Sequence, residues 1–282
     1  MKRFPLLPRN KHTDKRDYGH VLVVAGSEQY PGAALLTARA ALIGGAGLVS
    51  LLTPDSIRTA ILNKFPHEVM PVFFKASPAP QIQKLIRERR ISVLALGPGL
   101  GREAKISKWV RTVVQKSDAP IVLDADGLNA FQGRMRELGR HPSPLVLTPH
   151  AGEFKRLFGI HPPRVESDRI RLAKKLSKLY DGVLVLKGPN TLVVFRERIF
   201  RNFNGNPGMA KGGSGDVLTG IIAAFIAQGL SPFEASVWGV YFHGKAGDLA
   251  VKRTGEMSLT ASDLIDSLKN CWSSSVGRAA DL

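Results

Sequence analysis

Short, continuously apolar segments recur along the chain, and segments with helical spacing of apolar residues separate them. Residues 21–25 and 48–53 are the first two apolar segments, and an alanine-rich helical segment, residues 33–43, lies between them. Uninterrupted apolar runs of this kind are typical of strands buried on both faces of a parallel sheet. Because strand, helix and strand in this order form parallel units, the sequence predicts an α/β fold: a three-layer α/β/α sandwich with a mostly parallel central sheet.

The same alternation continues along the rest of the chain. The predicted strands cover residues 21–25, 48–53, 69–74, 92–96, 120–123, 145–147, 183–186, 192–195 and 199–202, and the predicted helices cover residues 33–43, 80–89, 103–116, 127–132, 153–158, 166–180, 217–226, 232–252 and 261–269. No linker, composition shift or internal repeat interrupts the pattern. We therefore expect a single domain over residues 19–282, preceded by a polar, proline-containing arm at residues 1–18.

Composition limits the compartment and the kind of site. The 282 residues are 44% hydrophobic and 22% charged, as in ordinary soluble proteins, and no apolar run is long enough to span a membrane. Cys271 is the only cysteine, which excludes an internal disulfide and a cysteine-based zinc site and fits a reducing compartment. We therefore expect a cytoplasmic protein with no membrane partner.

The predicted loops after the strands contain the most distinctive residues of the chain. Ligands of open parallel sheets bind at the carboxyl ends of the strands, where such loops meet. Gly97-Pro98-Gly99-Leu100-Gly101 is one residue short of a dinucleotide fingerprint, and fits either a close backbone approach to a ligand or a plain tight turn. The other loops are Gly26-Ser27, Asp124-Ala125-Asp126-Gly127-Leu128-Asn129, Thr148-Pro149-His150-Ala151-Gly152-Glu153 and Lys187-Gly188-Pro189-Asn190-Thr191.

A glycine-rich stretch precedes the most apolar predicted helix. Gly212-Gly213-Ser214-Gly215-Asp216 leads into residues 217–226, whose bulky side chains have the spacing of a helix with one strongly buried side. Unpaired backbone N–H groups and the helix dipole make such a helix start a plausible seat for phosphate or a developing anion. Asp216 is placed there to take a proton from a hydroxyl. The alternative, an N-cap with flexible glycines, is weaker because glycines surround Asp216 so densely.

Acidic and polar side chains recur at the ends of neighbouring predicted strands. Asp124, Asp126 and Asn129 follow one strand, and His150 and Glu153 follow the next. Carboxylates that converge on one crevice suit a hydrated Mg²⁺ bound to phosphates, whereas a zinc site needs more histidine or cysteine. Taken singly, Asp126 and Asn129 can also cap turns, and Glu153 can stand in a first helical turn.

Two further side chains at strand ends are candidates for ligand binding. His150 lies between a strand and a Gly-Glu turn, where its ring can hydrogen-bond a ligand. Lys187 ends a strand and can place its ammonium group on a phosphate, although lysines at strand ends more often face solvent. We assign structural roles to the other histidines, His12, His20, His67, His141, His161 and His243.

The net charge of +17 allows a different class of function, the binding of nucleic acid or another polyanion. The basic residues cluster at residues 84–90, 105–116 and 164–178, each of which has the pattern of the polar face of an amphipathic helix. No aromatic residues that could stack on bases are interleaved with them. A solvated basic surface without a specific nucleic-acid partner is the better interpretation.

These motifs together resemble those of a known family. The chain resembles the ADP- or ATP-dependent NAD(P)H-hydrate dehydratases, a branch of the ribokinase-like superfamily, from about residue 19 to residue 268. The combination of Thr-Pro-His-x-Gly-Glu and Gly-x-Gly-Asp in this order is the most specific part of the resemblance. The matching stretches are Gly19-His20-Val21 to Gly26-Ser27, Pro31-Gly32-Ala33-Ala34, Gly97 to Gly101, Asp124 to Asn129, Thr148 to Glu153, Lys187-Gly188-Pro189, and Asn206-Pro207-Gly208-Met209-Ala210 to Asp216.

The resemblance implies a lyase that repairs nicotinamide nucleotides. Its substrate would be the S-epimer of NADH or NADPH hydrated at the nicotinamide ring. ADP, which the analogy favours over ATP, would phosphorylate the ring hydroxyl and give AMP, and loss of phosphate would restore the double bond. Asp216 would act as the base, and the backbone N–H groups of Gly213, Ser214 and Gly215 would hold the phosphoryl group.

The resemblance also assigns binding residues, a cofactor and partners. Mg²⁺ would be the cofactor, and we expect a homotetramer and a functional link to a separate NAD(P)H-hydrate epimerase, because the arm before residue 19 is too short for an epimerase domain. A ribokinase-like kinase for a small molecule, such as a vitamin precursor, is the alternative enzyme, because the same fold and the same aspartate chemistry serve both. The implied residues are Ala33, Gly99, Gly101, His150 and Asp216 for the hydrate, Lys187, Gly188, Pro189, Asn190, Thr191 and Gly215 for the nucleotide, and Glu153 and Asp126 for the metal.

Overall fold

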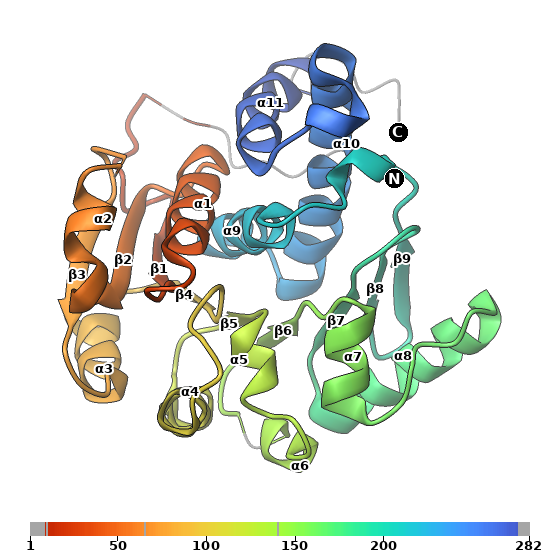
Figure 1. Cartoon of the computed structure of the whole chain (residues 1–282), viewed down its shortest axis with the longest axis horizontal. Helices are drawn as coiled ribbons and strands as arrows, with labels where there is room; N and C mark the ends of the chain where they lie inside the picture. The colour runs from red at the N-terminus through yellow and green to blue at the C-terminus, as the bar shows by residue number, and fades with distance from the viewer. Residues whose placement is uncertain (1–8, 10, 65, 140, 276–282) are drawn as a thin grey trace.

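A nine-stranded sheet forms the centre of the molecule (Figure 1), in a computed structural model that describes residues 9, 11–64, 66–139 and 141–275. The strand order is β3-β2-β1-β4-β5-β6-β7-β8-β9; strands β1 to β7 are parallel, and β8 and β9 are antiparallel to their neighbours. The mostly parallel sheet predicted from the sequence is therefore confirmed. The strands are β1 His20–Val24, β2 Leu48–Pro54, β3 Met70–Phe74, β4 Val93–Leu96, β5 Ile121–Leu123, β6 Leu145–Leu147, β7 Val183–Leu186, β8 Leu192–Phe195 and β9 Arg198–Arg201.

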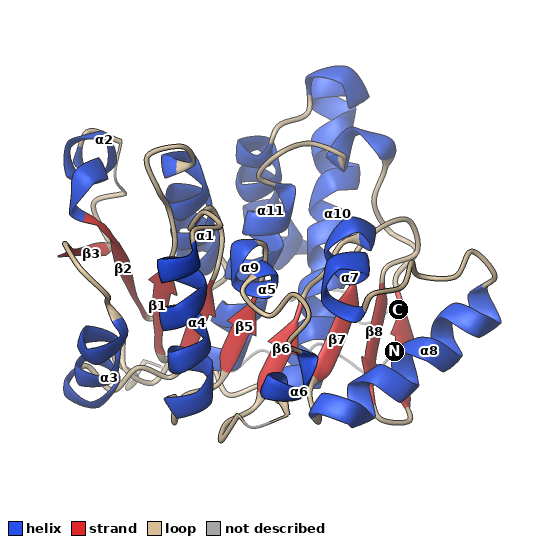
Figure 2. Cartoon of the chain, turned by 60° about the horizontal axis from the view of Figure 1, so that its bottom comes forward, coloured by secondary structure: helices blue, strands red, loops and turns tan. Residues whose placement is uncertain are grey.

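Helices cover both faces of this sheet (Figure 2). Alternate residues of β1 divide between two cores: Val21 and Val23 pack with α1, α9, α10 and α11, whereas Leu22 and Val24 pack with α3, α4, α7 and α8. The three-layer α/β/α arrangement is confirmed. The helices are α1 Pro31–Ile43, α2 Arg58–Leu62, α3 Ala79–Glu88, α4 Ala104–Lys116, α5 Asp126–Asn129, α6 Met135–Leu138, α7 Ala151–Phe158, α8 Glu166–Tyr180, α9 Ser214–Ala227, α10 Pro232–Ser258 and α11 Ala261–Ser275, with 3₁₀ turns at Asp55–Ile57 and Pro207–Met209.

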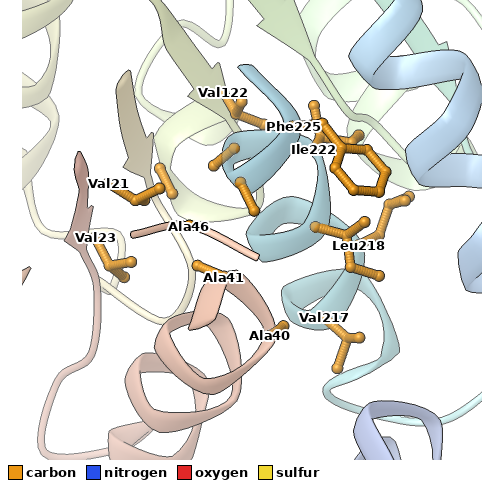
Figure 3. Packing of buried hydrophobic residues seen from close by; sticks show 14 of the residues in the cluster. Val21, Val23, Ala40, Ala41, Ala46, Val122, Val217, Leu218, Ile222 and Phe225 are labelled. Atoms are coloured by element: carbon orange, nitrogen blue, oxygen red, sulfur yellow. The ribbon is translucent and has the colours of Figure 1, made fainter. Parts of the chain in front are cut away.

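Helix α9 is more deeply buried than its sequence pattern predicts. Every residue from 217 to 227 is buried, because the sheet, α1, α10 and α11 surround the helix. Leu218, Ile222 and Phe225 of α9 belong to the same buried cluster as Val122 of the sheet and Ala40 of α1 (Figure 3). A Cβ atom at Gly220 would lie 2.4 Å from the carbonyl oxygen of Thr37 in α1, so the two helices need small residues where they meet.

The ends of the chain are described only in part. Residues 1–8 and 10 of the predicted arm and residues 276–282 of the predicted domain lie outside the described residues. Next to the domain, the Arg9 guanidinium lies 3.9 Å from the ring centroid of Tyr18 and donates to the carbonyl oxygen of Gly45. In the described part of the chain, no helix has both the length and the apolar character needed to cross a membrane.

Candidate active site

The predicted site loops meet at the carboxyl edge of the sheet because their strands are neighbours in register. Leu123 at the end of β5 pairs with Leu147 of β6, which in turn pairs with Leu184 of β7. This pairing brings the loops that begin at residues 124, 148 and 187 side by side. The amino end of α9 lies over them: a Cβ atom at Gly215 would lie 3.1 Å from Lys187 Nζ and 3.7 Å from Asp124 Oδ2.

A buried ion pair lies at the centre of this edge. Lys187 Nζ donates to Asp124 Oδ1 at 2.7 Å, and Glu153 Oε2 lies 3.6 Å from the same ammonium group. The other oxygen of Asp124 accepts a hydrogen bond from Thr219 Oγ1 of α9 at 2.8 Å. Burial disfavours the charged form of Lys187, but the attraction of Asp124 and Glu153 outweighs it and raises the pKa of Lys187. The ammonium group is therefore held in its charged form.

His150 and Glu153 form a capping box at the start of α7. His150 Nδ1 accepts from the backbone N–H of Gly152 at 3.0 Å and of Glu153 at 3.3 Å, and Glu153 Oε2 accepts from the His150 N–H at 2.8 Å. His150 Nε2 lies 3.4 Å from Glu153 Oε1, and 53% of the imidazole side chain is exposed. Desolvation lowers the pKa of His150, and the charges of Lys187 and Arg156 act in the same direction. The neutral ring thus presents a polar edge to solvent at the site.

Asp126 stabilises the glycine loop after β4. Its Oδ2 accepts from the backbone N–H of Gly101 at 2.9 Å, and its Oδ1 accepts from Asn129 Nδ2 at 3.0 Å. Asn129 Oδ1 in turn accepts from Arg156 Nε of α7 at 2.8 Å. Asp126 and Asn129 therefore make the kind of local contacts that stabilise turns, and they also connect α5 with the glycine loop after β4 and with α7.

The side chains available as metal ligands restrict the kind of metal ion that can bind at this edge of the sheet. The carboxylates of Glu153 and Asp126 already accept hydrogen bonds from nitrogen donors. No group of three or more metal-binding side chains occurs among the residues that the structure describes. These residues fit a hydrated Mg²⁺ that is bound mainly by phosphate oxygens, since Mg²⁺ commonly keeps several waters and takes only one or two carboxylates from the protein.

The start of α9 has the backbone geometry that the glycine-rich sequence predicts. Gly213 precedes the helix with φ of 91°, and a Cβ atom there would lie 2.6 Å from Leu36 Cδ1 of α1. The backbone N–H of Ser214 donates to the Lys211 carbonyl oxygen at 3.3 Å, whereas no backbone carbonyl of the described residues accepts from Gly213 or Gly215. Two N–H groups at this helix start therefore remain available to an anion.

Asp216 lies in the first turn of α9, where a carboxylate is largely removed from water. Burial, followed by repulsion from Asp124, raises the pKa of Asp216 to about 7, and Lys187 opposes this shift. Glu153 and Asp126 add smaller repulsions. A carboxylate with this proton affinity is suited to accept a proton near neutral pH. The geometry thus gives Asp216 the properties of a general base.

His243 of α10 also contacts the start of α9, which the sequence did not indicate beyond the glycine beside it. Its Nε2 lies 2.9 Å from the Ser214 carbonyl oxygen and 3.3 Å from Ser214 Oγ. Because a carbonyl oxygen only accepts, Nε2 carries the proton. Burial lowers the pKa of His243 to about 4, so the ring is neutral. Thr219 is the second residue at this site that the sequence did not reveal.

Hydrogen bonds from Arg169 of α8 stabilise the conformation of the loop after β7. The guanidinium group donates to the carbonyl oxygens of Asn190 at 3.2 Å and Pro189 at 3.4 Å. Gly188 and Asn190 have φ of 140° and 53°, and the Thr191 hydroxyl donates to the Gly188 carbonyl oxygen. Residues 188–190 are exposed and follow directly after Lys187. The predicted nucleotide-binding loop is therefore an ordered, accessible turn beside the ion pair.

Two of the predicted hydrate-binding residues, Ala33 and Gly99, meet at the start of α1. A Cβ atom at Gly99 would lie 2.8 Å from both Ala33 Cβ and Tyr30 Cβ, so only glycine allows this loop to touch α1. Leu36, one turn after Ala33, contacts the start of α9 at Gly213. The structure therefore joins Ala33 and Gly99 to the same helix start that carries Asp216.

The fold and this arrangement define the class of the protein, a ribokinase-like α/β protein. A ribokinase-like superfamily protein from Enterococcus faecalis superposes with a TM-score of 0.81 at 27% identity, covering 96% of this chain and 92% of that protein. The crystal structure of an ADP/ATP-dependent NAD(P)H-hydrate dehydratase from Bacillus subtilis, co-crystallised with ATP and Mg²⁺, superposes with a TM-score of 0.83 at 31% identity, covering 96% of this chain and 95% of that one.

The sequence comparison narrows the class to one family. The family model of the NAD(P)H-hydrate dehydratases matches residues 21–270. A bifunctional NAD(P)H-hydrate repair enzyme of Moorella thermoacetica is 40% identical over 270 residues, which are 93% of this chain and 51% of the relative. The chain belongs to the NAD(P)H-hydrate dehydratase family, and it spans about half the length of the curated relatives it matches.

Proposed function

We propose that this protein dehydrates the S-epimer of hydrated NADH or NADPH with ADP as the phosphoryl donor. In the net reaction, hydrate and ADP give the reduced nicotinamide nucleotide, AMP and phosphate. The observation that carries the proposal is Asp216, a buried carboxylate with its pKa raised to about 7 at a glycine-rich helix start, next to the charged Lys187. The family assignment supplies the substrate class.

The geometry supports two chemical steps. In the first, Asp216 takes the proton of the ring hydroxyl. The hydroxyl oxygen attacks the terminal phosphorus of ADP, and AMP leaves. The backbone N–H groups of Gly213 and Gly215, with that of Ser214 once it is released from Lys211, stabilise the charge on the transferring group. In the second step, the bond from the ring carbon to the phosphate oxygen breaks, a proton passes from the adjacent ring carbon to water, and the double bond is restored. Phosphate is a far better leaving group than hydroxide, which is the reason for the first step.

The other assignments belong to the same proposal. Ala33, Gly99, Gly101 and His150 contact the hydrate, and residues 187–191 hold the adenine nucleotide with Gly215. Mg²⁺ would supply charge neutralisation on the phosphates, and Glu153 and Asp126 would be the residues that hold it.

We further propose that residues 19–282 act as one domain, in the cytoplasm, as a homotetramer. The continuous sheet supports a single domain, because β1 near its beginning and β9 belong to the same nine-stranded sheet. The hydrate of the opposite configuration would need a separate epimerase. The solved Bacillus subtilis relative was crystallised with ATP, so ATP is the alternative phosphoryl donor.

The test is recovery of reduced nicotinamide from its hydrate. Purified protein is incubated with hydrated NADH, Mg²⁺ and either ADP or ATP, and absorbance of the reduced nicotinamide is recorded while AMP or ADP is measured by chromatography. We expect recovery with ADP, with one AMP formed for each NADH. No recovery with either nucleotide, together with a stable phosphorylated product from an alcohol substrate, would assign the small-molecule kinase function instead.

A further inference from the structure

We propose that Asp124 and Thr219 are positioning residues that fix the Lys187 ammonium group beside the start of α9, where it meets the phosphates of the bound nucleotide. The inference rests on the proposed function for the identity of the ligand. Its structural basis is a chain of hydrogen bonds through three elements: Lys187 Nζ after β7 donates to Asp124 Oδ1 after β5 at 2.7 Å, and Thr219 Oγ1 of α9 donates to Asp124 Oδ2 at 2.8 Å.

The burial of these three hydrogen-bonded side chains indicates a role other than stabilising the fold. Asp124 is 1% exposed, Thr219 is fully buried, and the Lys187 side chain is 16% exposed. A buried ion pair is often no more stabilising than a well-packed apolar pair, because both charges lose their hydration. An apolar pair would therefore serve the sheet equally well. What the ion pair adds is a positive charge, the Lys187 ammonium group, that is held at a fixed position.

The Lys187 ammonium group faces the start of α9. Gly215 has no side chain, and a Cβ atom there would lie only 3.1 Å from Lys187 Nζ. Nζ has three N–H donors; Asp124 takes one, and the Glu153 carboxylate, at 3.6 Å, is beyond normal hydrogen-bond length. The ammonium group thus retains donors for phosphate oxygens while its position is set by Asp124.

Thr219 differs in its hydrogen bond from two other buried hydroxyl side chains within helices. Thr37 of α1 and Ser236 of α10 donate to the carbonyl oxygen four residues earlier, at 2.9 Å and 2.7 Å, which is the usual local arrangement. Thr219 instead donates across to Asp124. It lies three residues after Asp216, on the same side of α9. The helix that carries the base is therefore tied to the carboxylate that positions the ammonium group.

The first experiment compares two variants at position 219 with a matched buried hydroxyl. Thr219→Val keeps the shape and removes the donor, Thr219→Ser keeps the donor, and Ser236→Ala removes a buried hydroxyl of α10 whose bond is local. Binding of ADP with Mg²⁺ is measured by calorimetry. We expect Thr219→Val to weaken ADP binding about tenfold, as loss of one charge-linked contact does, while the other two stay within about twofold of wild type.

A second arm uses the pH profile of kcat/KM to separate the effect of the Asp124 charge from that of the Thr219 hydrogen bond. The charged groups facing Asp216 are Asp124, Lys187, Glu153 and Asp126, and the neutral His243 of α10 contacts the same helix start. Asp124 repels the charged form of Asp216, so Asp124→Asn should move the acidic limb of the profile to lower pH. Thr219→Val, which keeps the Asp124 charge, should leave that limb in place and lower kcat/KM.

The outcomes separate this inference from the proposed function. ADP affinity of Thr219→Val equal to that of Thr219→Ser, with a loss of thermal stability like that of Ser236→Ala, would show that Thr219 is only structural and would overturn the inference. Failure of wild type to bind ADP would overturn it as well. If wild type binds ADP but does not restore reduced nicotinamide from the hydrate, the proposed function fails while the calorimetric test of the positioning residues still decides.

Discussion

Asp216 holds its position at a cost to folding. Burial and the neighbouring carboxylates raise its pKa to about 7 from an ordinary value of 3.8, so the folded protein binds this proton more tightly than the unfolded chain does. Stability from this group is present at acidic pH and falls as pH rises between the two pKa values. Above about pH 7, the folded state carries an unfavourable buried charge. The proposed mechanism needs the same ionised form, because Asp216 accepts the proton of the hydroxyl in that form.

The first prediction is that Asp216→Asn separates these two effects. The amide removes the buried charge, so the free energy of unfolding at pH 8 should rise by the order of 1–3 kcal/mol, with no such gain at pH 4. Dehydratase turnover should fall by more than about a hundredfold, the usual effect of losing a general base. Urea denaturation at both pH values and the hydrate assay give the measurements. Equal gains at pH 4 and pH 8 would contradict the electrostatic explanation.

The second prediction concerns the pH dependence of wild type. Because the proposed base, Asp216, would act only when ionised, kcat/KM should rise with pH through an acidic limb near pH 7, the value of its raised pKa. Lys187 lowers that pKa, so Lys187→Met should move the limb to higher pH. Steady-state rates with fixed nucleotide over pH 5 to 9 test both shifts. A limb near pH 4 in wild type would show that Asp216 is as well solvated as an ordinary carboxylate.

At the scale of the elements, the start of α9 depends on one backbone conformation. Gly213 has φ of 91°. A Cβ atom at this position would lie 2.6 Å from Leu36 Cδ1 and 2.9 Å from Ala261 Cβ. The third prediction is that Gly213→Ala costs about 1–3 kcal/mol of stability and displaces the N–H groups that we propose hold the phosphoryl group. Thermal unfolding and ADP binding would both report it.

Gly212 provides the matched control for that substitution. A Cβ atom at Gly212 meets nothing within 4 Å, and its φ lies outside the left-handed range. Gly212→Ala should therefore change the free energy of unfolding by less than about 0.5 kcal/mol. If both alanine variants lost stability equally, general stiffening of the loop, and not the conformation of Gly213, would explain the effect.

The sequence predicted the helices and strands better than the side-chain contacts between them. All nine predicted strands were confirmed, because most are short, mainly apolar runs with clear breaks on either side. The helices α2 and α6 were not predicted, since five and four residues are too few to show a helical period. The strand-end loops could be grouped into a site because parallel strands end at one edge.

Side-chain pairing across elements could not be predicted in the same way. Lys187 was expected on phosphate, but its contact with Asp124 depends on β5 and β7 flanking β6. Thr219 and His243 are within helices whose apolar pattern gives no sign of a polar partner. Their contacts exist only after α9 is laid over the sheet and α10 against α9.

At the scale of the whole molecule, the charges are unevenly distributed between inside and outside. The net charge is +17, and the buried charged side chains include the carboxylates of Asp124 and Glu153. The largely buried Lys187 ammonium group offsets one of these two carboxylates, so the buried groups account for little of the net charge and the positive excess lies on the remaining side chains. Both proposed substrates are anionic nucleotides, and a positive surface attracts such ligands over a distance that salt shortens from about 30 Å at 0.01 M to about 8 Å at 0.15 M.

The fourth prediction is that salt weakens capture of ADP without affecting the chemical steps. Between about 0.02 M and 0.3 M KCl, kcat/KM for ADP should fall several-fold, while kcat at saturating ADP stays within about twofold. The comparison of the two constants is its own control, since damage to the protein by salt would lower both. A nucleic-acid-binding function would instead give DNA or RNA binding with a steep salt dependence, equal in wild type and Asp216→Asn. Insensitivity of kcat/KM to salt would mean that the basic surface has no part in substrate capture.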